Sequence, residues 1–260
     1  MPKPTRRSPL KAAPLRQAGA SIQEEIDRLR DDVIFDRLTL LFGAFAIWVL
    51  ALVLWLFPAP LGVFFALLSV LFVGVIAWAI PPTLRAKREI GHLRQGLAGE
   101  RAVAEHLELI AHDGFWVVHD LRGEGFNVDH VIVGTQGVFT IETKTLSKPA
   151  VGDARVRFDG EALMVDSHVL DRDPLVQARA QAAWVRRTLE ELTGQGYPVR
   201  PVVVFPGWYV ERAPAAAKAN VWVLEPKELR GWLSREPHML PRHAVELIRN
   251  RLKLVARGGA

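Results

Sequence analysis

Two uninterrupted apolar runs dominate the pattern of hydrophobic and polar positions. Residues 38–57 and 61–80 contain no charged side chain, and each has the length of about 20 residues that spans the hydrocarbon core of a bilayer. Only Pro58-Ala59-Pro60 separates the runs, and proline resists helix continuation. The pattern predicts two transmembrane helices, residues 38–57 and 61–80, joined as a tight hairpin.

Two other interpretations of these runs are a cleaved signal peptide and a pair of buried helices in a soluble protein. The first run begins only at Leu38, is longer than a signal-peptide core and is followed at once by a second run. Three tryptophans, Trp48, Trp55 and Trp78, lie in runs that have no polar face. Both observations favour a hairpin that stays in the membrane.

The outer ends of the hairpin are basic, whereas its turn contains no Lys or Arg. The nearby basic residues are Arg28, Arg30, Arg37, Arg85, Lys87, Arg88 and Arg94. By the positive-inside rule, both chain termini and the globular domain face the cytoplasm. We therefore expect a multi-pass protein of the cell inner membrane, with two spans in contact with membrane lipid.

The segments beside the hairpin have different patterns. Residues 1–37 are predicted to be a basic disordered tail, rich in proline, followed by a short amphipathic helix. This helix is expected to begin at Ser21, which forms a capping box with Glu24. Residues 81–95 are predicted to be a basic juxtamembrane linker, and residues 96–260 a single domain.

Residues 96–260 alternate between helical spacing and short apolar strands. Val103, Leu107 and Ile110 predict a helix over 98–111. Strands are predicted at 115–119, 128–133, 138–143, 155–158, 162–165, 201–205 and 221–224, and further helices at 174–192, 226–233 and 241–254. This order of elements is typical of an α/β sandwich with a mixed central sheet.

The distribution of charge and the cysteine content limit the kinds of functional site that the chain can contain. Residues 1–94 carry 12 Lys and Arg against 7 Asp and Glu, whereas residues 95–260 carry 21 of each. The basic excess therefore flanks the membrane, where anionic lipid headgroups explain it. The chain has no cysteine, which excludes disulfides, thiolate nucleophiles and thiolate metal sites.

Three charged residues are predicted to meet on one face of the sheet. Glu142 and Lys144 lie two apart on a strand and must share a face. With a two-residue turn at Gln136-Gly137, Asp129 pairs opposite Lys144 and shares that face. Two carboxylates and one ammonium can hold a divalent cation and activate water beside a phosphodiester.

The order of these motifs resembles the nuclease-related domain (NERD) family, of the restriction-endonuclease-like, PD-(D/E)xK type. The resemblance covers most of the chain after Gly96. Its motifs are Gly96-Leu97-Ala98-Gly99-Glu100, residues 127–133, residues 137–144, Asp173-Pro174-Leu175-Val176-Gln177 and residues 201–205. The resemblance implies a restriction-endonuclease-like α/β sandwich preceded by the transmembrane hairpin.

The resemblance also implies roles for five residues. Asp129 and Glu142 would ligate Mg²⁺ or Mn²⁺, and Lys144 would orient water or stabilise negative charge at the phosphorus. Glu100 would be an accessory carboxylate and Gln177 a supporting polar residue.

Each of these residues also has an ordinary structural explanation. A Glu-x-Lys pair is commonly a solvated ion pair on a strand. Glu100 can be a first-turn acid that is favoured by the helix dipole, and Gln177 a surface amide. His130 points away from Asp129 on a regular strand, which favours a packed histidine over a metal ligand.

Nucleic-acid contacts are predicted on the helix over 174–192. Arg179, Arg186 and Arg187 can reach phosphates, although a solvated helix face explains them too. Trp184 and Trp208 can stack on bases or pack in the core.

The resulting prediction is a membrane-anchored, metal-dependent nuclease that hydrolyses phosphodiester bonds of DNA, with RNA as the second candidate substrate. The alternative is a non-catalytic, membrane-tethered module that binds nucleic acid or protein. A small-molecule enzyme has no support, because the sequence lacks a phosphate-binding glycine loop and a nucleophile elbow.

Overall fold

The computed structural model describes residues 15–56, 62–148, 154–165 and 173–258. The chain forms two compact units, one of Ile22–Gln95 and one of Met1–Ser21 with Gly96–Ala260. The predicted tail over residues 1–14 and the Pro58-Ala59-Pro60 turn lie outside the described residues.

The unit of Ile22–Gln95 is a pair of long helices that contact each other through side chains. Trp48 donates a hydrogen bond from Nε1 to Oγ of Ser69 at 3.0 Å, and its ring stacks on Phe72 with centroids 5.6 Å apart. The helical segments are α1 (Ala20–Arg28), a π-helical segment (Leu29–Phe35), α2 (Asp36–Leu56) and α3 (Gly62–His112), which continues into the other unit.

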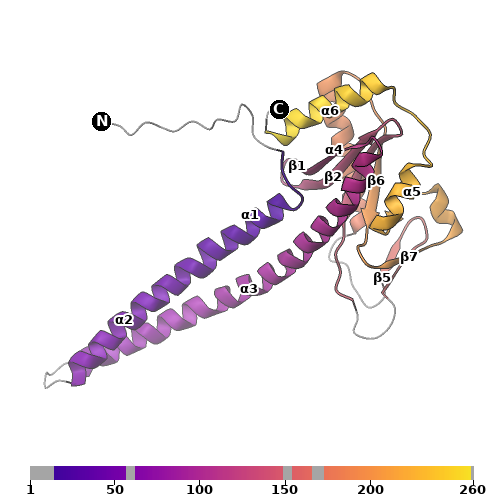
Figure 1. Cartoon of the computed structure of the whole chain (residues 1–260). Coiled ribbons are helices and arrows are strands. Elements are labelled where there is room, and N and C mark those ends of the chain that lie inside the picture. Colours follow the sequence, from indigo (N-terminus) through magenta and orange to yellow (C-terminus); the bar gives the residue numbers. More distant parts are fainter. Residues whose placement is uncertain (1–14, 57–61, 149–153, 166–172, 259–260) are drawn as a thin grey trace, which may run out of the picture. The chain divides into compact units, whose positions relative to one another are not determined.

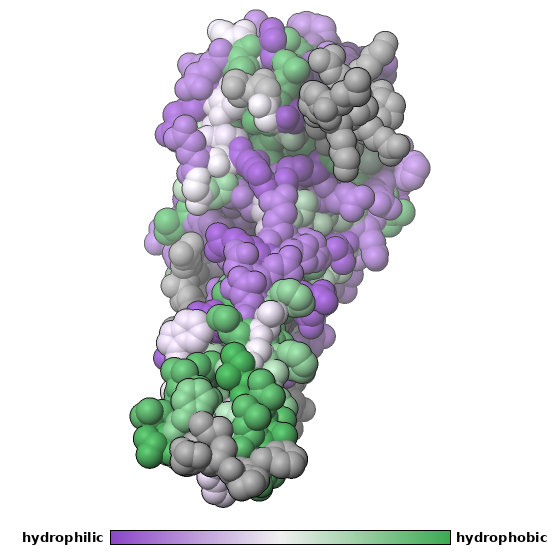
Figure 2. Space-filling view, turned by 90° about the vertical axis from the view of Figure 1, so that its left-hand side faces the viewer, coloured by the Kyte–Doolittle hydropathy of each residue, from purple (hydrophilic) through white to green (hydrophobic). Residues whose placement is uncertain are grey.

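Most apolar side chains of this pair point outward. Phe42 is 74% exposed and Val63 is 78% exposed, and Figure 2 shows such residues, in green, gathered in one region of the surface. Both helices are long and apolar enough to span a membrane.

Helix α3 is longer than predicted. It runs without a break through Pro81, Pro82 and the rest of the expected linker over 81–95 (Figure 1). The strong helix formers after the prolines, among them Leu84, Ala86 and Lys87, favour this continuation. Gly96-Leu97-Ala98-Gly99-Glu100 therefore lies inside a helix and does not open one.

The second unit is built on a mixed sheet, as predicted, and this sheet has five strands. The strand order is β1-β2-β3-β6-β8; the first three strands are antiparallel, and β6 and β8 continue parallel to β3. The strands are β1 (Trp116–Arg122), β2 (Asn127–Gly134), β3 (Gly137–Thr143), β6 (Val199–Val204) and β8 (Trp222–Leu224).

Helices cover both faces of this sheet (Figure 1). One core joins Val131 of β2 to Val185 of α4 (Pro174–Thr193) and Ile248 of α6 (Arg242–Ala256). The other core joins Ile132 to Leu107 of α3 and to α5 (Leu229–Leu233), which follows a 3-10 turn at Pro226–Glu228. Alternating side chains of one strand therefore supply two cores.

A second, three-stranded sheet was only partly predicted. Its order is β5-β4-β7, with β5 (Leu163–Val165), β4 (Arg155–Phe158) and β7 (Tyr209–Arg212), and a 3-10 helix at Pro214–Lys218 follows it. The hairpin of β4 and β5 was expected from the sequence, whereas β7 was not. Trp208 packs in the core of this region and is 1% exposed, so it cannot stack on a base.

The β2–β3 turn differs from the prediction by one residue, and this moves the register. Gly134 pairs with Gly137, so Thr135 and Gln136 form the turn and Gly137, at φ 141°, begins β3. The backbone N–H groups of Met239 and Leu240 donate to the carbonyl of Thr135 and hold the turn there. Continued along the strands, this register places Asp129 opposite Glu142, and the predicted pairing with Lys144 is wrong.

Candidate active site

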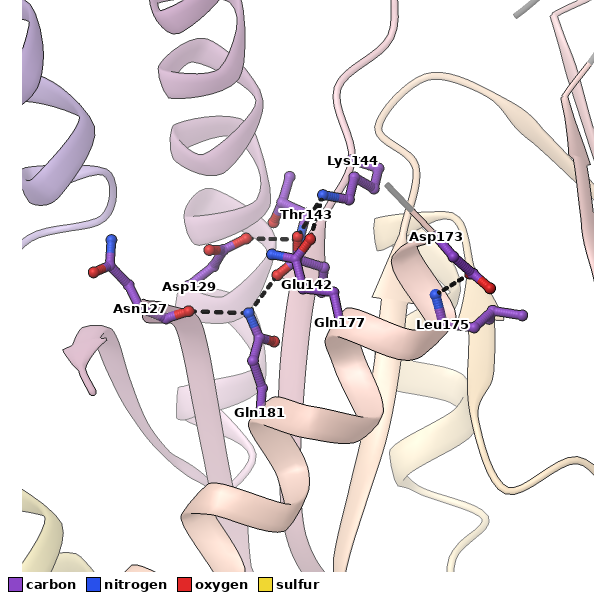
Figure 3. Close-up of polar contacts among 9 residues, drawn as sticks. All are labelled: Asn127, Asp129, Glu142, Thr143, Lys144, Asp173, Leu175, Gln177 and Gln181. Carbon is purple, nitrogen blue, oxygen red and sulfur yellow. Dashed lines mark hydrogen bonds and ion pairs between the residues drawn. The ribbon is translucent and has the colours of Figure 1, made fainter. Parts of the chain in front are cut away.

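Asp129, Glu142 and Lys144 meet where β2 begins and β3 ends (Figure 3). Nζ of Lys144 lies 2.8 Å from Oε1 of Glu142 and donates to Oε1 of Gln177 at 2.9 Å. The backbone N–H of Thr143 donates to Oδ2 of Asp129 at 2.7 Å. Glu142 is only 2% exposed, so this Glu-x-Lys pair is a largely buried ion pair and not a solvated one.

Helix α4 contributes two amides to this group. Gln177 faces Lys144, and one helical turn further on Gln181 donates from Nε2 to Oε2 of Glu142 at 2.6 Å and to the carbonyl of Asn127 at 3.0 Å. Gln181 was not predicted, although its spacing of four residues from Gln177 places both amides on one helix face. The two glutamines hold Glu142 and Lys144 from the same side.

Glu100 joins the group from α3. It is 7% exposed, and burial raises its pKa from 4.5 to about 7, with the charges of Asp120 and Glu142 adding to the effect and a hydrogen bond from the Gly19 backbone opposing it. Because α3 begins at Gly62, Glu100 lies far inside the helix. A first-turn role in the helix dipole is therefore excluded.

Asp129 is the carboxyl group most affected by its neighbours. Burial first, then the charges of Glu142 and Glu100, raise its pKa well above the usual value, while the Thr143 N–H and Lys144 act in the opposite direction. The carboxyl groups of Asp129, Glu142 and Glu100 thus lie near one ammonium group, that of Lys144. Such a group has a deficit of positive charge, and a bound cation would relieve it.

All of these residues lie in the segment that matches a known family. The family model of the nuclease-related domain (NERD) matches residues 95–206. This chain carries a nuclease-related domain. No curated protein and no solved structure matches the chain. The family match indicates a nuclease-related function for the unit that contains the five-stranded sheet.

A short N-terminal segment is fastened to the nuclease-related domain through Asp120. This residue lies within β1 and has a left-handed backbone, φ 51°, which is uncommon for a residue other than glycine. Its buried carboxylate forms an ion pair with Arg16 and accepts hydrogen bonds from the backbone N–H and the hydroxyl of Ser21, each at 3.0 Å. Asp120 therefore holds Arg16 and Ser21 against β1.

His130 is a packed histidine, as its predicted side of the strand indicated. It is fully buried and its Nδ1 lies 2.8 Å from Nδ1 of His119. Burial lowers the pKa of both rings, that of His130 more strongly. Both imidazoles are therefore neutral at physiological pH.

The carboxylates of the nuclease-related domain suit a hard cation that keeps much of its water. Among the residues that the structure describes, no three or more His, Cys, Asp or Glu side chains form a metal-binding group. Mg²⁺, however, is usually bound through one or two carboxylates and keeps several waters. Asp129 and Glu142 supply such a pair, and the carboxyl group of Glu100 lies close enough to raise the pKa of Asp129. The residues present thus fit Mg²⁺ or Mn²⁺.

The three arginines predicted to contact phosphates lie on two faces of α4. Arg187 lines a pocket together with Gln177 and Gln181. Arg179 and Arg186 line another pocket, where Nε of Arg179 donates to the Asn220 side chain at 3.3 Å. Only Arg187 is on the helix face that supplies the two site amides.

Proposed function

We propose that this chain is a membrane-anchored, metal-dependent nuclease that hydrolyses phosphodiester bonds of DNA, with RNA as the second candidate substrate. The main support is the group formed by buried Glu142 and partly buried Asp129 and Lys144 inside a nuclease-related domain. A fold keeps such an unfavourable set of charges at a stability cost. Perturbed carboxyl groups of this kind cluster at functional sites.

Asp129 and Glu142 would hold Mg²⁺ or Mn²⁺. When bound, the ion would supply a more acidic water and polarise the phosphate oxygens.

The chain's own residues prepare the site for this chemistry. Glu142 and Gln177 fix the ammonium of Lys144, which can stabilise the negative charge that develops on the phosphate during attack. Gln181 fixes Glu142 through Oε2. Glu100, with a pKa of about 7, can hold a proton beside the site at neutral pH.

The hairpin would tether this activity to a membrane. Both α2 and α3 are long and apolar enough to span one, and the basic residues lie at the outer ends of the two apolar runs. By the positive-inside rule, both termini and the nuclease-related domain would lie on the cytoplasmic side of the cell inner membrane. The substrate would then be cytoplasmic nucleic acid close to the membrane.

A second candidate function is a non-catalytic binding module on the same fold. One observation favours it: both carboxylate oxygens of Glu142 already have partners, Lys144 and Gln181. In this alternative, the charged group would stabilise the fold and would not bind a cation.

The test is a cleavage assay with the full chain in detergent micelles. Single- and double-stranded DNA and RNA are incubated with Mg²⁺ or Mn²⁺, and the same mixtures are prepared with EDTA. Asp129→Ala and Lys144→Ala are compared with the wild type, and Lys218→Ala, which removes an exposed lysine outside the site, is the matched control.

Cleavage that is lost in both site variants and in EDTA, but kept in Lys218→Ala, would support the nuclease and identify its substrate. A folded wild-type protein that cleaves none of the four substrates would favour the binding module.

A further inference from the structure

A pocket of about 590 Å³ lies directly beside the candidate active site. It runs along one face of α4, because its helical wall is formed by residues three or four apart. The residues that matter here are Phe126, Val176, Gln177, Gln181, Trp184 and Arg187. We call this the α4 pocket.

The wall of the α4 pocket is mainly apolar and aromatic. Val176 is 59% exposed and Phe126 is 37% exposed, and Trp184 is partly buried. The rings of Phe126 and Trp184 meet edge to face, with centroids 5.4 Å apart and an angle of 85°. An exposed aromatic pair beside a polar site offers a surface for a flat, neutral ring.

The α4 pocket and the active site share a wall. Gln177 and Gln181 both line the pocket, and the same two amides bind Lys144 and Glu142. A group in the pocket would therefore lie within one side chain of the residues that would act on the phosphate. In a nucleic-acid strand, a base and its own phosphate are separated by one sugar.

Gln181 supplies an independent indication of a ligand. Both hydrogens of its amide are used, by Glu142 and by the carbonyl of Asn127. Its Oε1 is buried and has no hydrogen-bond donor among the described residues, although native structures rarely leave a buried polar atom unpaired. This unpaired acceptor belongs to a residue that lines the α4 pocket.

The charges of the pocket favour a neutral ring over a phosphate. Its only cation among the lining residues is Arg187, which is exposed, and its only anion is Asp173, which accepts from the Leu175 N–H. An exposed arginine at such a site can bind the strand's backbone, while the aromatic wall is left for the base.

We propose that the α4 pocket receives an unpaired nucleobase of the strand that the site cuts. This inference rests on the proposed nuclease function and adds a substrate class to it: single-stranded nucleic acid, or a strand whose base is displaced from its pair. In an intact duplex the bases are stacked and paired, so their faces cannot reach Phe126 and Trp184.

The test measures binding without cleavage, on the full chain in detergent micelles with EDTA and low salt. Three labelled probes of equal length are used: oligothymidylate, the same strand with abasic sugars, and a blunt duplex. The variants are Trp184→Leu, which keeps an apolar side chain against the core, and Phe126→Ala. Tyr209→Ala, which removes a 63% exposed aromatic ring on β7, is the matched control, and Arg186→Ala is compared with Arg187→Ala.

We expect oligothymidylate to bind about tenfold more tightly than the abasic strand, since stacking of one base contributes on that order. Phe126→Ala and Trp184→Leu should reduce this ratio toward one without weakening the abasic strand, and Tyr209→Ala should leave it unchanged. Arg187→Ala should weaken both single strands, and Arg186→Ala should weaken neither.

Equal binding of oligothymidylate and the abasic strand by the wild type would overturn the proposal, and so would duplex binding as tight as single-strand binding. If Trp184→Leu does not fold, Phe126→Ala and the abasic comparison decide the matter. Base-dependent binding by a protein that cleaves nothing in Mg²⁺ would keep the pocket and reject the nuclease. Metal-dependent cleavage without base-dependent binding would support the nuclease and reject the base-binding role of the α4 pocket.

Discussion

The two ends of helix α3 show how one element can meet two different requirements. Near its start, most apolar side chains outside the contact with α2 are exposed: Val63 is 78% exposed and Val70 is 72% exposed. Near its end, Val103 and Leu107 are fully buried, while Arg101 and Glu105 face solvent. The second part buries its apolar face inside the protein, whereas the first part needs an apolar surrounding medium, which a bilayer provides.

The two parts also differ in where they place charge. The apolar run over residues 62–80 contains no charged side chain, but the C-terminal part of α3 carries Glu100 into a group of acidic residues. A stable fold would gain from removing that buried carboxyl group. The comparison teaches that apolar exposure distinguishes the part of α3 that is long and apolar enough to span a membrane, and that polar burial distinguishes the part that carries the candidate site.

The largest effect on folding should come from a buried leucine in the C-terminal part of α3. Leu107→Ala should destabilise the globular unit by about 4 kcal/mol, because a fully buried leucine leaves a cavity. The matched change Leu71→Ala removes a side chain that is 62% exposed and should alter the unfolding of that unit by less than about 0.5 kcal/mol. Urea unfolding of the full chain in micelles, followed by fluorescence, compares the two.

If Leu107→Ala and Leu71→Ala lowered the free energy of unfolding equally, this result would contradict the difference between the buried and exposed parts of α3.

The next effect is a dependence of stability on pH that comes from Glu100. Its pKa rises from 4.5 to about 7 on folding, so between these values the folded state binds a proton that the unfolded state has lost. The stability contribution of Glu100 should therefore be greatest below about pH 4.5, fall by about 3 kcal/mol between pH 4.5 and pH 7, and level off above pH 7. Glu100→Gln should flatten this part of the profile in EDTA.

The control for the pH profile is Glu105→Gln, which changes an exposed glutamate on the same helix and should keep the wild-type profile. A Glu100→Gln protein that still loses the same stability between pH 5 and pH 8 would show that other groups cause the dependence.

A smaller effect should distinguish two glycines of α3. A Cβ atom on Gly99 would lie 1.6 Å from Oγ1 of Thr145, next to Lys144, so Gly99→Ala should cost about 2 kcal/mol and lower activity by shifting that strand end. A Cβ atom on Gly74 meets nothing within 4 Å, so Gly74→Ala should be neutral within about 0.5 kcal/mol. Thermal unfolding and cleavage rates of the two variants test this difference, and equal behaviour would contradict it.

Much of the fold follows from local patterns in the sequence. The β-branched and aromatic runs of β2 and β3 and the Asp173-Pro174 start of α4 predicted these elements correctly, because strand propensity and helix capping are short-range effects. Strand β7 was missed because it is held by parallel pairing with β4, more than 50 residues earlier. The register of Asp129 was missed because Met239 and Leu240 hold the Thr135 turn from the far end of the chain.

In the candidate site, too, some contacts follow from local sequence spacing and others do not. The pair Glu142 and Lys144 could be predicted, since residues two apart on a strand share a face. The contacts of Gln181 with Glu142 and of Arg16 with Asp120 join residues far apart in the sequence, and no local spacing reveals them. The buried setting of Glu100 likewise depends on the packing of α3 against other elements.

The central claim is that Asp129 and Glu142 form a metal-dependent hydrolytic centre, and the most direct measurement joins metal binding to cleavage in one sample. Mn²⁺ is titrated into the full chain in micelles and followed by electron paramagnetic resonance, for the wild type and Glu142→Gln, while cleavage of the preferred substrate is measured alongside. The account predicts that Glu142→Gln loses the bound Mn²⁺ signal and about a thousandfold in rate together. A Glu142→Gln protein that cleaves at the wild-type rate, or a wild type that cleaves equally well in EDTA, would contradict it.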